Sequence, residues 1–221
     1  MKTVRLVRRL LAVSIAAVLL GLNLACVGPG APTRQPVVAR IWPSPPEVPR
    51  ISFENALSRP ADMGIEEGVL QRIYRFLAGT PETPLVNPHG LTADAQGRLY
   101  VVDAYTRKIH VYDRAERSYQ LWPATGKDLV SPIGITIDDA RGRVYVSDSA
   151  QALVRVFSRD KGEVLGEIRS GGMGRPTGMA VNPLTDELLV VDTANSTILR
   201  FALADHGLRG VIGREGIETG Q

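Results

Sequence analysis

The chain has 221 residues, of which 44% are hydrophobic and 22% are charged, with 26 Lys and Arg residues against 23 Asp and Glu residues. Four of the basic residues and none of the acidic ones lie in residues 1–25, so the rest of the chain has a formal net charge of −1. This balance excludes the basic surface on which nucleic-acid binding depends, and the single cysteine excludes an internal disulfide.

Residues 1–26 have the pattern of a secretory signal peptide. An almost wholly apolar run from Leu10 to Leu22 follows a basic start that contains Lys2, Arg5, Arg8 and Arg9. The run is too short, and wrongly flanked, for a membrane-spanning helix. We therefore exclude this segment from the folded core.

Cys26 closes the apolar run. The sequence Leu24-Ala25-Cys26 resembles the end of a bacterial lipoprotein signal, although Asn23 departs from the aliphatic residue usual at its position. The resemblance implies that Cys26 is lipidated and anchors the mature protein to a membrane of the cell envelope, facing the periplasm or the exterior. An ordinary signal peptide cleaved near Ala25 is the alternative, and Arg8-Arg9 leaves twin-arginine export open.

Residues 27–49 are predicted to form a proline-rich tether. Proline and glycine crowd this span at Gly28, Pro29, Gly30, Pro32, Pro36, Pro43, Pro45, Pro46 and Pro49. Such a composition favours an extended chain that buries little apolar surface, so the segment would hold a folded domain away from the membrane. Binding of residues 42–46 to a proline-recognising groove is the alternative.

Residues 50–83 are predicted to contain an edge strand and a capping helix. Apolar and polar residues alternate in residues 50–53, which predicts an outer strand that completes a blade formed elsewhere in the chain. Apolar residues at helical spacing in residues 66–78 predict a helix, which Gly79 ends. We expect this helix to cover an exposed strand or edge of the domain, and docking of a partner protein is the alternative.

One sequence unit occurs three times between residues 88 and 201. Each copy begins with Pro-x-Gly, and the opening residues Pro88, Pro132 and Pro176 lie 44 apart. Each copy then has an apolar segment that ends on an aspartate, at Asp103, Asp148 and Asp192. A period in the forties with four short apolar segments per copy predicts four-stranded antiparallel blades, so the fold class is all-β.

The repeated pattern resembles the NHL-repeat family of β-propellers. Pro-x-Gly, an aliphatic residue, Ala or Thr and Asp or Asn precede a segment of the type Leu/Val-Tyr-Val-x-Asp, and the third copy departs at Asn182 and Leu189. The resemblance covers about half the chain and implies a partial propeller over residues 84–221, with three blades of an expected six. A fourth blade would begin near residue 220, so we expect the chain to be a fragment; closure by a second copy or a partner is the alternative.

In a propeller, the connections that enter the first strands and the turns that follow the second strands lie on one face, which we call the loop face. This face is where a ligand is expected, and its candidate binding residues are His89, Arg107, Lys127 and Arg175. We expect Asp103, Asp148 and Asp192 to cap turns rather than to form a metal ring, because each carboxylate ends a strand where a turn begins.

Catalytic motifs are lacking in the sequence. It contains no serine-nucleophile, phosphate-loop or calcium-loop motif. A peptide-amidating lyase of the NHL type carries zinc, but only His89 is expected near the propeller axis here, since His110 lies in a third strand and His206 in a polar loop. We predict no metal, no cofactor and no catalytic residue.

Two functions follow from these features. The first is a membrane-anchored, non-catalytic binding or scaffold protein that presents its loop face to a protein or a small ligand. The second is a periplasmic propeller enzyme, a lyase or lactone hydrolase that could depend on a metal, with part of its site in missing blades. The net charge of −1 and the export signal both oppose binding to nucleic acid.

Overall fold

The computed structural model describes residues 40–44, 46–66, 68, 73, 77, 84–123, 128–214 and 216. The chain divides into two compact units, Met1–Glu54 and Asn55–Gln221, which are described separately. Cys26, the tether up to residue 39 and Lys127 lie outside the described residues, as does most of the helix predicted at residues 66–78.

The described part of the first unit is a small hairpin. Strand β1 (Ile41–Trp42) pairs antiparallel with β2 (Ile51–Ser52), and backbone hydrogen bonds of 2.8 and 2.7 Å extend the pairing on either side. The strand predicted at residues 50–53 is therefore present, but its partner is β1 and not a strand of a blade. The chain turns back between the two strands, so the end of the predicted tether contributes to this hairpin.

The second unit contains three four-stranded antiparallel sheets in which strands adjacent in sequence are neighbours in space. Blade 1 consists of β3 (Pro88–Ala93), β4 (Leu99–Asp103), β5 (Lys108–Asp113) and β6 (Ser118–Trp122). Blade 2 consists of β7 (Pro132–Asp138), β8 (Arg143–Asp148), β9 (Leu153–Ser158) and β10 (Val164–Ile168). Blade 3 consists of β11 (Pro176–Asn182), β12 (Glu187–Asp192), β13 (Thr197–Ala202) and β14 (Leu208–Ile212). The predicted all-β fold built from propeller blades is confirmed.

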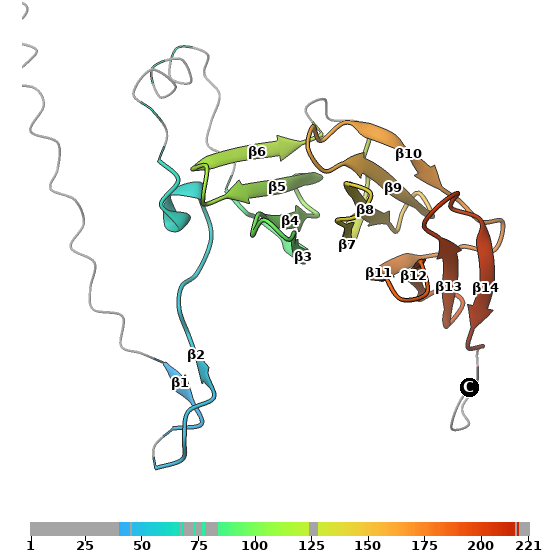
Figure 1. Ribbon diagram of the computed structural model, residues 1–221, viewed down its shortest axis with the longest axis horizontal. Coiled ribbons are helices and arrows are strands. Elements are labelled where there is room, and N and C mark those ends of the chain that lie inside the picture. Colours follow the sequence, from blue (N-terminus) through green and yellow to red (C-terminus); the bar gives the residue numbers. More distant parts are fainter. Residues whose placement is uncertain are drawn as a thin grey trace, which may run out of the picture. The chain divides into compact units, whose positions relative to one another are not determined.

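The first strands of the three blades lie along a common inner edge. Figure 1 shows β7 between β3 and β11, with β6, β10 and β14 on the outside. The register of each first strand shifts between its proline and the aliphatic residue three positions later. At this irregular point the glycine of Pro-x-Gly approaches the next blade: a Cβ on Gly90 would lie 2.6 Å from the carbonyl oxygen of Ile133. The motif thus permits close packing at the axis.

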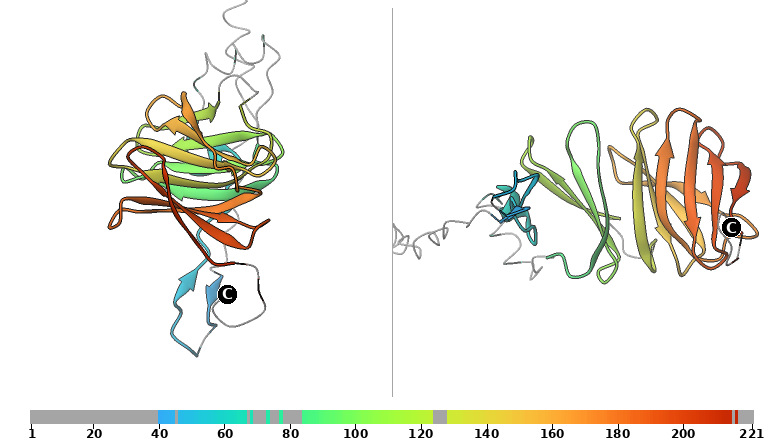
Figure 2. Two further views of the ribbon diagram at one scale, coloured as in Figure 1. Left: turned by 90° about the vertical axis from the view of Figure 1, so that its right-hand side faces the viewer. Right: turned by 90° about the horizontal axis from the view of Figure 1, so that it is seen from below.

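Each blade has two apolar faces, which we name by the neighbour that they meet. The forward face points to the next blade and the rear face to the previous one, as the side-by-side sheets in Figure 2 show. Tyr100 and Ile109 on the forward face of blade 1 pack with Val144 and Phe157 on the rear face of blade 2. A second core of the same kind joins blades 2 and 3. Both faces of the middle strands of blade 2, β8 and β9, are buried, because apolar residues occupy consecutive positions there.

The part of the rear face of blade 1 formed by β4 and β5 is covered by the start of the second unit, whereas Leu91 of β3 on the same face is exposed. Ile65 is 5% exposed and packs with Val101 and Tyr112, and Leu57 and Met63 adjoin this cluster. A short 3-10 helix, η1 (Pro60–Met63), forms part of this covering segment. The covering residues lie just before residues 66–78, where the sequence predicted a helix in that role.

Candidate functional site

The loop face is built around the aspartates that end the second strands. In blade 1, one carboxylate oxygen of Asp103 accepts the backbone N–H groups of Val86 and Asn87, from the connection that enters β3. The other oxygen accepts those of Tyr105 and Thr106, both at 2.9 Å, from the turn between β4 and β5. One buried carboxylate therefore joins the two loops of the blade.

Asp148 and Asp192 occupy the same position in blades 2 and 3. Asp148 accepts backbone N–H groups of Val130, Ser131 and Gln151, and Asp192 accepts those of Gly174, Arg175 and Ala194. Burial alone would raise the pKa values of Asp103 and Asp192, but their backbone N–H donors outweigh it and lower both pKa values. Asp103 and Asp192 are therefore charged groups that fix the loops, and Asp148 accepts loop N–H groups in the same way.

The basic residues predicted on the loop face are exposed. His89 lies at the start of β3, Arg107 in the turn after β4 and Arg175 directly before β11. Within the described residues their side chains form no hydrogen bond or ion pair with one another. Lys127 lies outside the described part of the chain. Tyr105, which was not predicted, is 73% exposed in the same turn as Arg107; its only sequence signal is an aromatic residue within a polar turn.

The three histidines lie apart. His110 is buried in β5 beneath the segment that covers blade 1, whereas His206 lies in the turn before β14, where its Nε2 is 3.3 Å from both Arg143 Nη1 and Tyr145 Oη. Burial, together with the Arg143 charge, lowers the pKa of His206. Among the residues that the structure describes, no group of three metal-ligating side chains is placed to hold an ion. No helix in this described part is both long and apolar enough to cross a bilayer.

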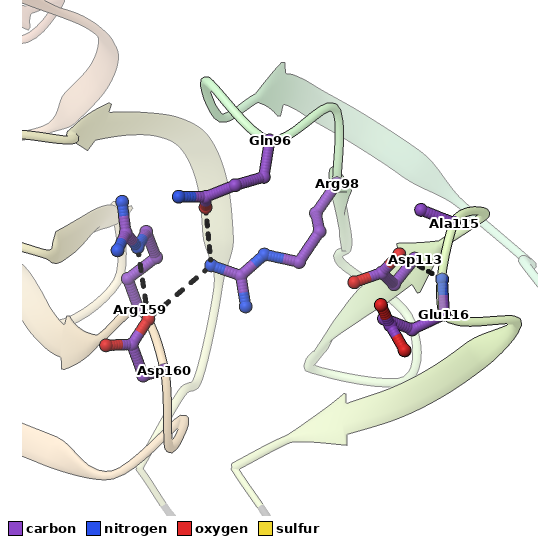
Figure 3. Close-up of a pocket in the computed structure, with 7 residues that line it drawn as sticks. All are labelled: Gln96, Arg98, Asp113, Ala115, Glu116, Arg159 and Asp160. Carbon is purple, nitrogen blue, oxygen red and sulfur yellow. Dashed lines mark hydrogen bonds and ion pairs between the residues drawn. The ribbon is translucent and has the colours of Figure 1, made fainter.

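A charged groove lies at the opposite ends of the strands and was not predicted. It has a volume of about 450 Å³ and is lined by Gln96, Arg98, Asp113, Ala115, Glu116, Arg159 and Asp160. Figure 3 shows that the lining comes from two turns of blade 1 and from the turn between β9 and β10 of blade 2. The groove therefore exists only where two blades meet.

The arginines of this groove already have carboxylate partners. Arg98 Nε lies 2.6 Å from Asp94 Oδ2, and a guanidinium nitrogen lies 3.6 Å from Asp160. Arg159 contacts Asp139 at 3.0 Å and Asp160 at 3.2 Å. In Figure 3 the carboxylates of Asp113 and Glu116 lie on the other side of Arg98 from Asp160. The lining groups are acids, guanidinium groups and an amide, so this groove can bind polar ligands by hydrogen bonds and ion pairs.

The comparisons with known proteins relate mainly to the fold. No family model matches the chain. A stretch of 93 residues is 29% identical to the Arabidopsis thaliana protein SUPPRESSOR OF QUENCHING 1, chloroplastic, and covers 37% of this chain but only 9% of that protein. This similarity is too limited in extent to assign the chain to a family.

Three solved structures have a similar fold. Hydrazine synthase of Kuenenia stuttgartiensis has a TM-score of 0.50 at 17% identity, over 60% of this chain and 37% of the other. A chain of a nidogen/laminin complex has a TM-score of 0.51 at 17% identity, over 61% of this chain and 53% of the other. A streptogramin B lyase has a TM-score of 0.50 at 14% identity, over 61% of this chain and 43% of the other. The chain spans about half or less of the length of these structures. At the level of fold, the described blades are those of a β-propeller.

Proposed function

We propose that this protein is a membrane-anchored binding protein of the cell envelope whose loop face binds an acidic group on a protein or a small ligand. The observation that carries the proposal is the division of charge on this face. The carboxylates of Asp103, Asp148 and Asp192 are fully buried and accept hydrogen bonds from their own loops, whereas Arg107 and Arg175 are exposed.

Loops fixed in this way favour binding, because a ligand need not order them and the entropic cost of association falls. A single exposed ion pair contributes only about 0.2–1 kcal/mol, so several basic groups have to act together on one anion. Tyr105 adds an aromatic surface beside Arg107, and aromatic side chains are enriched in protein interfaces.

A thermal-shift experiment tests the loop face with inorganic phosphate, citrate and a polyglutamate peptide as ligands. A bound ligand raises the melting temperature by mass action. We expect a rise for at least the peptide, and loss of most of it in the double variant Arg107→Gln/Arg175→Gln. The matched control is Arg114→Gln, an exposed arginine in the turn between β5 and β6 at the other end of blade 1. Equal loss in variant and control would reject the loop face as the site.

The anchor is supported by the sequence alone, through the apolar run that ends at Cys26. The intact mass of the protein extracted from membranes tests this part separately. We expect the mass of a chain that begins at Cys26 plus a diacylglyceryl and an acyl group, and release into the soluble fraction for Cys26→Ala. A mature chain without the lipid increment would remove the anchor from the proposal and leave the loop face to be judged alone.

A propeller enzyme is the second candidate, since one structural neighbour is a streptogramin B lyase. That likeness concerns the fold alone. Melting curves with added Zn²⁺ or with EDTA distinguish the two functions for a metal-dependent enzyme: a resident metal would raise the midpoint and EDTA would lower it. No response to either reagent counts against a metal-dependent enzyme.

A further inference from the structure

A histidine joins blades 2 and 3 at the ends of the strands opposite the loop face. His206 lies in the turn between β13 and β14 of blade 3, and its ring packs edge-on against that of Tyr145, with 5.7 Å between the ring centres. Its Nε2 atom lies 3.3 Å from Arg143 Nη1 and 3.3 Å from Tyr145 Oη, and both of these residues belong to β8 of blade 2. We call this set of contacts across the two blades the junction contact.

The partners of Nε2 define the protonation state of the imidazole. A guanidinium group has N–H donors and no acceptor, so its hydrogen bond to Nε2 requires a lone pair on that atom. The hydroxyl of Tyr145 can donate to the same lone pair. His206 is therefore neutral in the junction contact, with its proton on Nδ1. A proton on Nε2 would remove the acceptor and bring two like charges to within 3.3 Å of each other.

Blade 1 uses the equivalent arginine and tyrosine in a different way. Arg98 and Tyr100 occupy there the positions that the arginine and tyrosine of β8 occupy in blade 2. Both contact the carboxylate of Asp94 within their own blade, at 2.6 and 3.0 Å. A carboxylate of this kind keeps its charge at neutral and mildly acidic pH, whereas an imidazole titrates in this range.

The turn that carries His206 has a close counterpart in blade 2. His206 adopts the left-handed backbone conformation with φ 61°, and Gly162 holds the same position of the turn between β9 and β10 with φ 66°. Each backbone N–H donates to the carbonyl four residues earlier, at 3.0 and 2.8 Å. Of these two matched turns, the one in blade 3 carries a titratable side chain at this position and the one in blade 2 does not.

The charges around the imidazole favour its neutral form. Its titratable neighbours come from both blades, and they are Arg143 and Tyr145 of β8, Arg141 in the turn before β8, and Asp205 beside the histidine. Burial and the two arginine charges lower the pKa of His206, whereas the charge of Asp205 acts in the opposite direction. Asp138 and Asp186 bind Arg141 at 3.1 and 2.7 Å and offset its charge.

We propose that the junction contact is a pH-sensitive switch, which holds the turn at residues 203–207 on blade 2 while His206 is neutral and breaks when Nε2 takes up a proton. Arg143 Nη1 also donates to the carbonyl of Leu203 at 3.0 Å, so the group that would repel a charged ring is the one that holds the turn. The proposal depends neither on the loop face nor on the membrane anchor.

The sign of the response follows from the two states of the ring. Because the folded pKa is depressed, the contribution of the junction contact is complete above about pH 6.5 and is lost as the pH falls through the folded pKa. Acidification therefore frees one end of blade 3, whereas neutral and basic solutions keep it on blade 2.

Hydrogen exchange of the full chain in detergent, resolved by residue between pH 7.5 and 4, tests the switch. The readout is the protection factor of the His206 amide divided by that of the Gly162 amide, because a loss of global stability lowers both. We expect this ratio to fall in total by about tenfold for each unit by which folding lowers the pKa of His206.

Two glutamine variants separate the imidazole from other titrating groups. His206→Gln keeps an oxygen acceptor that takes up no proton in this range, so the exchange ratio should stay constant with pH. His89→Gln is the matched control: His89 is exposed on the loop face, and its replacement should leave the response of the parent chain unchanged.

NMR titration of the His206 ring measures the pKa directly, with the signal assigned by its absence in His206→Gln. We expect a pKa below about 6.5, and a higher value in Arg143→Met, which removes the like charge. Arg107→Met, at an exposed position of the loop face, should not change it. A pKa of about 6.5 or above in the parent chain, an exchange ratio independent of pH, or a full pH response in His206→Gln would each overturn the proposal.

Discussion

The backbone of Gly134 packs directly against the carbonyl oxygen of Thr177, so that a Cβ at Gly134 would occupy the space of that oxygen. Gly134 belongs to blade 2 and Thr177 to blade 3, and the two residues follow the prolines that open β7 and β11 by two and one positions. The contact explains why the repeated motif ends in glycine: only a residue without a Cβ leaves room for the backbone of the next blade.

Gly134→Ala should destabilise the propeller, whereas Gly178→Ala should not. The methyl group at Gly134 meets a backbone carbonyl and Ser147 Oγ, at 3.0 Å, and overpacking of this kind costs about 1–3 kcal/mol. At Gly178 the methyl group makes only an ordinary contact with Val191. Urea denaturation at low protein concentration measures both changes. Equal denaturation midpoints for the two variants would show that blades 2 and 3 move apart enough to accept the methyl group without a loss of stability.

Ser147→Ala tests the polar part of the same junction. Ser147 Oγ accepts the N–H of Gly134 at 2.8 Å and donates to the carbonyl of Thr177 at 2.6 Å, and the side chain is fully buried. Its removal leaves a donor and an acceptor without this partner, so we expect a loss of about 1–3 kcal/mol in the free energy of unfolding. Ser149→Ala removes one hydrogen bond, from Ser149 Oγ to the carbonyl of Pro176, at a half-buried position where water can replace the hydroxyl. This variant should therefore lose less free energy of unfolding than Ser147→Ala.

Asp192→Asn should lower stability more than Asp186→Asn does. An amide at position 192 replaces one acceptor oxygen with a donor that faces either the N–H group of Gly174 or those of Arg175 and Ala194, which costs about 2–3 kcal/mol for a buried charged acceptor. Asp186 forms an exposed ion pair with Arg141, and such pairs contribute about 0–1 kcal/mol. Chemical denaturation at neutral pH compares the variants.

The pH dependence of the same group has a definite sign. The folded state holds the pKa of Asp192 below its ordinary value, so its contribution to stability is present above about pH 4 and is lost as the pH falls through the folded pKa. The difference between the parent chain and Asp192→Asn should therefore shrink below about pH 4. A difference that stays constant down to pH 2 would contradict the role of the charge.

The repeat period predicted the blades because equivalent positions in each blade hold similar residue types and make the same contacts. Tyr100 and Tyr145 are both fully buried at equivalent positions, and Asp103 and Asp148 both accept loop N–H groups. Such features depend on contacts within one blade or between successive blades, and these recur with the period. They can therefore be read from spacing alone.

Features that depend on a single junction could not be predicted in this way. The charged groove requires Arg98 and Asp160 to meet across two blades, although they lie in different turns. The cover on blade 1 requires residues 57–65 to fold onto β5, and the repeat pattern contains no information on that contact. The burial of His110 depends on the same covering segment. The sequence places His110 in a third strand but does not show that its side chain is buried.

His110 makes the most specific pH prediction. Its ring is fully buried, with Nδ1 2.9 Å from the hydroxyl of Tyr119, and its Nε2 has no hydrogen-bond partner among the described residues. Burial lowers the pKa of His110 to about 4, although the charge of Asp103 acts in the opposite direction. The folded protein therefore holds a neutral imidazole at pH values where the unfolded chain takes up a proton.

The sign of this pH dependence follows from the linkage between proton binding at His110 and folding. The folded pKa of His110 is depressed, so the stability that depends on the neutral ring is complete above about pH 6.5 and is lost as the pH falls toward 4. Between pH 7.5 and 5 the contribution of His110 to the free energy of unfolding should fall by about 2 kcal/mol, at about 1.36 kcal/mol per pKa unit.

Urea denaturation at these two pH values should show a fall that is about 2 kcal/mol larger in the parent chain than in His110→Phe/Tyr119→Phe, because His206, whose pKa is also lowered, contributes equally to both. The double variant keeps two buried rings and removes the imidazole and the hydroxyl nearest to its Nδ1. The Tyr112 hydroxyl, 3.5 Å from Nδ1, loses this partner at both pH values, so its loss does not alter the pH dependence. His89→Phe is the control, because His89 is exposed and its loss should leave the pH dependence in place. If the double variant keeps the full pH dependence, His110 is accessible to protons in the folded state, and the segment around Ile65 does not close the rear face of blade 1 in solution.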